Sequence, residues 1–209
     1  ICIVIICLGW IPLCGLRVLK PQEAVVLTLF GKYVGTLKED GFYWVNPFCT
    51  SYNPAAATKL NQSGDVKVAA TPTAELIDKK IPLKIMTLSN SRQKINDCLG
   101  NPVEISIAVT WRVKDTAKAV FNVNNYKEFL SLQCDSALRN IVRLYPYDVS
   151  PNVDTTGDGI ADEGSLRGSS DVVAKRISDE IQQRVEEAGI EIIEARITYL
   201  AYATEIAAV

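Results

Sequence analysis

A strict alternation of apolar and polar positions is the clearest pattern in this chain. From Val103 to Val113 every second residue is apolar, and the residues between them are polar or small. A period of two residues is typical of a strand that has one face on a core. The preceding stretch, 96–102, is rich in turn-forming Asn, Asp, Gly and Pro, so we expect the hairpin partner of this strand within 83–95.

Two later segments carry the spacing of amphipathic helices. The first has a capping-box pattern, with Asn125 as N-cap and Glu128 three residues later, and its apolar stripe extends to about residue 144. The second begins at Ser170 and ends at Gly189, a residue type that favours the left-handed conformation of a helix C-cap. Its apolar residues recur at every fourth position: Val173, Ile177, Ile181 and Val185.

Shorter β-rich runs occupy much of the remaining chain. Segments 25–30 and 42–45 are predicted strands, and 53–80 is a predicted surface excursion with one short strand at 66–69. A final strand is predicted at 190–200, where apolar and polar residues again alternate. The apolar residues expected on one face of that strand are Ile193, Ala195, Ile197 and Tyr199.

The N-terminus is an uncharged apolar segment. Residues 1–16 contain no charge, and the first charged residue is Arg17. A helix of this length is about 24 Å long, shorter than the roughly 20 residues that a bilayer span requires. Because the first residue is not Met, we expect the C-terminal part of a longer membrane segment; a buried core helix is the alternative. The side chains expected within the membrane are Ile1, Val4, Ile5, Ile6, Leu8, Trp10, Ile11, Leu13 and Leu16.

Composition excludes several classes of function. The 22 basic and 24 acidic residues give a net charge of −2, which argues against a nucleic-acid partner. The chain has no histidine, so it lacks Ser-His-Asp triads, Cys-His pairs and HExxH zinc sites. The glycines fit no phosphate-binding loop, and we therefore expect no catalytic residues. Basic residues after the apolar segment favour a cytoplasmic location for the rest of the chain: Arg17, Lys20 and Lys32.

Several short motifs follow the apolar segment in a characteristic order. They are PQEAVV at 21–26, FGK at 30–32, DGFYWVNPF at 40–48, VKDTAKA at 113–119, NY at 125–126, ALR at 137–139, AGIEIIEARI at 188–197 and ATEIAA at 203–208. No single motif is diagnostic, but their order resembles the stomatin/prohibitin/flotillin (SPFH, or band-7) superfamily. Apart from two insertions, the resemblance covers nearly all of 20–209.

The resemblance implies an α+β fold class. The implied order is a membrane segment (1–19), a first small α/β subdomain (20–95, with an insertion at 53–80), a second (96–200, with an acidic insertion at 150–168) and the start of a long coiled-coil-type helix (201–209). It also implies a non-enzymatic membrane scaffold that binds lipids, homo-oligomerises into a ring or cage and organises membrane microdomains. The alternative is a regulatory subunit that controls a membrane-bound protease.

Two groups of side chains are candidates for contacts with other molecules. An aromatic cluster is predicted either to enter the first core or to contact the membrane surface: Phe42, Tyr43, Trp44 and Phe48. A charged helix face is predicted either to be solvated or to contact neighbouring subunits: Lys175, Arg176, Asp179, Glu180 and Arg184.

The acidic insertion is a weak candidate for calcium, and no other cofactor is expected. Its oxygen-bearing residues have the spacing of an EF-hand loop, and Gly159 stands where that loop turns sharply. Position 12 of the loop is Ser165 rather than a bidentate Glu, so a plain solvated loop is the alternative. The candidate ligands are Asp154, Thr156, Asp158 and Asp162.

Overall fold

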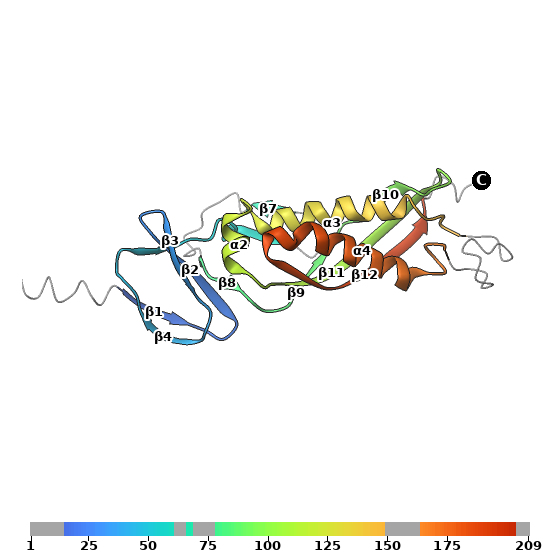
Figure 1. Cartoon of the computed structure of the whole chain (residues 1–209). Coiled ribbons are helices and arrows are strands. Elements are labelled where there is room, and N and C mark those ends of the chain that lie inside the picture. The colour runs from blue at the N-terminus through green and yellow to red at the C-terminus, as the bar shows by residue number, and fades with distance from the viewer. Residues whose placement is uncertain (1–14, 61–65, 69–77, 149–163, 204–209) are drawn as a thin grey trace, which may run out of the picture.

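The computed structural model describes residues 15–60, 66–68, 78–148 and 164–203 of the chain. The described part is elongated, with small sheets at one end and a longer sheet accompanied by helices at the other (Figure 1). Every strand pair among these residues is antiparallel. The fold is therefore a mixture of sheets and a few helices, consistent with the α+β class predicted from the sequence.

The N-terminal region is built around β2, which pairs with β3, β5 and β8. A separate two-stranded ribbon joins β1 to β4. The strands of this region are β1 (Leu16–Leu19), β2 (Glu23–Leu29), β3 (Lys32–Leu37), β4 (Gly41–Trp44), β5 (Cys49–Ser51) and β8 (Ile81–Pro82). The predicted strands at 25–30 and 42–45 are confirmed. Residues 16–19, predicted as the end of the membrane segment, instead form β1, because their alternating side chains match those of β4.

The C-terminal region is centred on the long strand β11 (Pro102–Val113). β12 (Ile190–Tyr202) pairs along one edge of β11, and β9 (Met86–Ser89) and β10 (Gln93–Asn96) pair along the other. The hairpin partner predicted within 83–95 is thus confirmed. The same pairing puts residues 86–95 in this second sheet, whereas the sequence assigned them to the first subdomain.

Helices α3 (Tyr126–Val142) and α4 (Ser170–Val185) pack with the sheet, and a short α2 (Thr116–Phe121) precedes them. The predicted cap at Asn125 is confirmed, because its side chain accepts hydrogen bonds from two backbone N–H groups of the first turn of α3. After α4, the short 3-10 helix η2 (Glu186–Ala188) ends at Gly189, which has the expected left-handed φ of 64°.

The main core lies between the long sheet and the helices. The apolar face of β11 is almost completely buried, as are the apolar stripes of α3 and α4. Ala55 and Thr58 are also buried, and the Nζ atom of Lys127 in α3 donates to both backbone carbonyls, at 3.1 and 2.6 Å. The start of the predicted surface excursion at 53–80 therefore packs against α3. It continues into β6 (Thr58–Leu60), which pairs with β7 (Val66–Val68).

β12 departs from its predicted pattern. Its register against β11 shifts between Thr110 and Trp111, which leaves Ile193 without a direct partner. Ile193 is 46% exposed, whereas Ile190, Ile192 and Ala195 are buried. A bulge reverses the alternation of side chains across it, so the predicted face is wrong at Ile193, whereas Ala195 is buried and Ile197 packs against the core as predicted. Residues 201 and 202, predicted to begin a helix, still belong to β12; 204–209 lie outside the described residues.

Candidate functional site

The β1–β4 ribbon exposes one apolar face. Val18 lies opposite Phe42, and Leu16 lies opposite Trp44. Directly opposed residues of an antiparallel pair point to the same face, and successive residues alternate. Val18, Phe42 and Trp44 are 61%, 68% and 62% exposed. The short alternating sequences of the two strands thus combine into a continuous ladder of largely exposed apolar side chains.

The opposite face of the ribbon belongs to a small core. Leu19 is buried with Val25, Leu27 and Cys49, and Tyr43 packs against this cluster. The Tyr43 hydroxyl donates to the backbone carbonyl of Glu39 at 3.1 Å, so its polar end is satisfied. The ribbon is therefore amphipathic: one face packs against the protein, and the other is largely exposed.

A second apolar pair lies at the turn between β2 and β3. Phe30 and Phe48 stack with ring centroids 6.4 Å apart, and they are 88% and 63% exposed. Phe30 has a φ of 49° and is followed by Gly31 with a φ of 85°. A positive φ is unusual for a bulky residue. The tight turn holds Phe30 outward, where its ring stacks on that of the similarly exposed Phe48.

The apolar leader, residues 1–14, precedes the residue at which this ribbon begins. The backbone N–H of Val45 donates to the carbonyl of Gly15 at 2.9 Å, which extends the β1–β4 pairing by one residue. A Cβ atom at Gly15 would lie 2.1 Å from the Val45 carbonyl oxygen, so only glycine fits this approach. This close approach fixes the backbone of Gly15 beside Trp44, at the point where residues 1–14 join the described chain.

The sequence identified part of this surface. Of the aromatic cluster, Phe42, Trp44 and Phe48 are exposed, as a membrane contact requires, whereas Tyr43 packs inward, as the core interpretation requires. Val18 and Phe30 were not predicted from the sequence as part of this surface. The signal for Val18 was the alternation LRVL at 16–19, and the signal for Phe30 was an aromatic residue directly before a turn glycine. The other predicted membrane residues, from Ile1 to Leu13, lie outside the described residues.

The charged residues proposed for subunit contacts have different environments. Arg184 is used within the chain: it contacts Glu180 at 2.7 Å and Ser136 of α3 at 2.9 Å. Arg176 lies over the ring of Tyr145, 5.6 Å from its centroid. Asp179 is exposed, and Lys175 lines a cleft between α4 and β12.

The described residues offer little for catalysis or metal binding. Burial raises the pKa of the Cys134 thiol, with a further contribution from Asp135, and burial also raises that of Cys98. Nucleophilic cysteines require the opposite shift. No cluster of three potential metal-ligating side chains occurs in the described part of the chain. The calcium candidates Asp154, Thr156, Asp158 and Asp162 lie outside it. Across the residues that are described, no helix combines the length and apolarity needed to cross a membrane.

The fold and the exposed ribbon define a mixed α/β domain with an amphipathic end. The comparison with protein families is specific: the model of the SPFH domain / Band 7 family matches residues 17–208. The chain therefore belongs to the SPFH domain / Band 7 family, whose members are generally membrane-associated scaffolds rather than enzymes. A comparison with curated proteins found no match.

Proposed function

We propose that this chain is a non-enzymatic membrane-anchored scaffold. Its apolar leader enters the bilayer, and the exposed β1–β4 face lies in the membrane interface. Identical copies assemble into a ring or cage that organises the surrounding microdomain. The observation that carries the membrane part of this proposal is the ladder of Val18, Phe42 and Trp44, exposed directly after the leader.

An exposed apolar ladder has a clear physical cost in water. Transfer of apolar surface out of water gains about 25 cal/mol per Å², and contiguous exposed apolar patches generally mark interaction sites. Tryptophan suits the bilayer interface because its ring is apolar and its N–H is polar. The basic residues Arg17, Lys20 and Lys32 follow the leader, which favours placing the domain on the cytoplasmic side, where anionic lipids are enriched.

The position of Trp44 tests the membrane contact. The chain has three tryptophans; Trp10→Phe leaves Trp44 and the fully buried Trp111. We expect vesicles with brominated acyl chains to quench the Trp44 emission of this variant. The Trp10→Phe/Trp44→Phe control retains only Trp111 and should not be quenched. Equal emission of the first variant in brominated and unbrominated vesicles would exclude the proposed interface contact.

Imaging tests the assembly. The full chain, purified in mild detergent and examined by electron microscopy, should form closed particles of uniform size. Single copies at all concentrations would contradict a scaffold. A protease that co-purifies in a fixed ratio, without homo-oligomeric particles, would favour the regulatory subunit that the sequence leaves as the alternative.

A further inference from the structure

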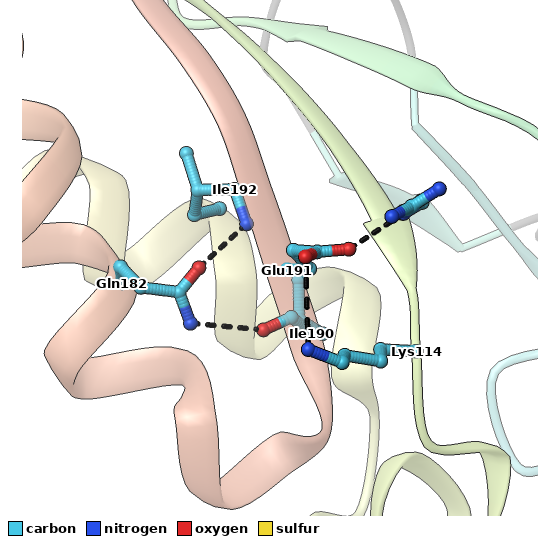
Figure 2. A network of polar contacts seen from close by, with 6 residues as sticks. Lys114, Gln182, Ile190, Glu191 and Ile192 are labelled. Carbon is cyan, nitrogen blue, oxygen red and sulfur yellow. Dashed lines mark hydrogen bonds and ion pairs between the residues drawn. The ribbon is translucent and has the colours of Figure 1, made fainter.

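The outer edge of β12 is only partly covered. Among the described residues β12 pairs with β11 alone, so its second edge has no neighbouring strand. Figure 2 shows how α4 covers the first part of that edge. The Gln182 side chain donates to the carbonyl of Ile190 at 3.3 Å and accepts from the N–H of Ile192 at 2.7 Å. One amide side chain thus takes the place that a neighbouring strand would occupy.

Beyond Ile192 the edge opens into a cleft of about 700 Å³. Five consecutive residues of β12, 193–197, line one wall, and the N-terminal half of α4 lines the other. Side chains of a strand alternate between its two faces, so a wall that includes every residue of a run is a wall along the strand edge. Ile193, displaced by the bulge, is exposed at one end of this wall.

The sequence of this open edge is self-complementary. It is Ile193, Glu194, Ala195, Arg196, Ile197, with an isoleucine at each end and opposite charges on either side of the central alanine. Within one chain Glu194 and Arg196 contact each other at 2.6 Å, and their side chains are 49% and 74% exposed. Both charges are therefore available on the same face of the strand.

We propose that β12 of one copy pairs antiparallel with β12 of a second copy, centred on Ala195. This register places Glu194 opposite the partner's Arg196, and Arg196 opposite the partner's Glu194. It also places Ile193 opposite the partner's Ile197. The pairing joins two sheets edge to edge around a two-fold axis. It deepens the proposed scaffold function and rests on it, because it specifies one contact of the assembly.

Charge complementarity distinguishes this edge from one that is protected against pairing. Protected edges carry bulges and charges that repel or obstruct a second strand. β12 has bulges, but its two edge charges are of opposite sign and exchange places under two-fold symmetry. An unrelated partner strand would not need this symmetry, so a second copy is the occupant that the sequence favours.

Charge exchange gives a direct test on the full chain in detergent, with association measured by sedimentation velocity. In the pair, Glu194→Arg places two arginines opposite each other, and Arg196→Glu places two glutamates opposite each other. Each variant alone should associate about tenfold more weakly, since favourable cross-strand pairs become repulsive ones. An equimolar mixture of the two should regain association, and so should the double variant Glu194→Arg/Arg196→Glu. Glu187→Arg, an exposed change of equal charge in η2, should associate normally.

Two results would overturn the pairing. One is unchanged association of both single variants, which would mean that copies meet elsewhere or that another molecule occupies the edge. The other is weakened association that neither the mixture nor the double variant restores. The brominated-vesicle measurement separates this inference from the proposed function when each charge variant is placed in the Trp10→Phe background and reconstituted into vesicles. Retained Trp44 quenching with monomeric protein removes the β12 contact only, whereas lost quenching with intact pairing removes the membrane contact only.

Discussion

The two ends of this molecule differ in how far they bury tryptophan. Trp44 in β4 is 62% exposed, whereas Trp111 in β11 is completely buried. The N-terminal cluster has only four buried hydrophobic residues, and no helix covers the outer face of its ribbon among the described elements. At the other end, α3 and α4 supply apolar stripes that enclose the inner face of β11.

This difference in burial implies that the apolar residues of the two ends contribute differently to the stability of the fold. A sheet buries an apolar face only where another layer covers it. The long sheet has its cover within the chain, so its apolar residues contribute to stability. The outer face of the β1–β4 ribbon is largely exposed, so its residues should add little to the stability of the fold. Substitutions at the two ends should therefore have very different consequences.

The largest contrast is expected between the two tryptophans. Trp111→Ala removes a side chain that is fully buried and packs edge-on against Tyr126, with centroids 6.3 Å apart. It should lower the free energy of unfolding by about 3–5 kcal/mol. Trp44→Ala should change it by less than about 0.5 kcal/mol. Urea unfolding of both variants in the same detergent, followed by circular dichroism, measures the contrast; similar losses would mean that the ribbon face is part of the core.

A smaller contrast is expected between two glycines that share a positive φ. At Gly189 an added Cβ would lie 2.4 Å from the carbonyl oxygen of Asp115, whereas at Gly31 it would meet open space. Gly189→Ala should therefore cost about 2–3 kcal/mol, through both backbone strain and steric conflict. Gly31→Ala should cost about 1 kcal/mol, from strain alone. Equal unfolding midpoints for the two variants would contradict the close approach at Gly189.

The sequence predicted the C-terminal region well because local signals there agree with the tertiary structure. The alternation in β11, the cap at Asn125 and the C-cap at Gly189 are all confirmed. β12 shows where such reasoning fails. Its bulge depends on pairing with β11, a contact distant in sequence, and no periodic pattern reveals the one-residue shift that exposes Ile193.

The candidate surface was harder to predict, for a similar reason. An aromatic run such as 42–48 is compatible with a core or with an exposed patch, and only the β1–β4 register separates Trp44 from Tyr43. Residues 16–19 continue an apolar segment in sequence, and the alternation LRVL is too short to distinguish a strand from the end of that segment. The open edge of β12 was also invisible, because strand order is a property of the complete sheet.

An effect of intermediate size is expected at Gln182, whose side chain covers the outer edge of β12. Gln182→Ala removes the donor and the acceptor that cover Ile190 and Ile192 (Figure 2). The free energy of unfolding should fall by about 1–2 kcal/mol, because water only partly replaces the two hydrogen bonds that are lost. Urea unfolding measures it, with Gln183→Ala, an exposed neighbour on α4, as the control. An effect no larger than that of the control would show that water replaces this cover without cost.

The smallest expected effect is the pH dependence of the ion pair beside that cover. Arg112 donates to Glu191 at 2.6 Å. The Nζ atom of Lys114 lies 3.7 Å from the same carboxylate (Figure 2). The hydrogen bond from Arg112 lowers the pKa of Glu191 from its ordinary value; desolvation opposes this shift, and the attraction of Arg112 and Lys114 adds to it. A carboxylate with a lowered pKa stabilises the fold above its ordinary pKa and loses that contribution as the pH falls through the lowered value.

Glu191→Gln should therefore lower the urea midpoint slightly at pH 7, and the difference from the unaltered chain should close as the pH falls below 4.5. Added salt should reduce the same difference at pH 7, because the pair is partly exposed to solvent. Glu187→Gln, which changes an exposed carboxylate in η2, is the matched control and should show neither trend. A deficit of Glu191→Gln that persists unchanged in acid would mean that the side chain acts through packing, so that charge contributes nothing to holding β12 against β11.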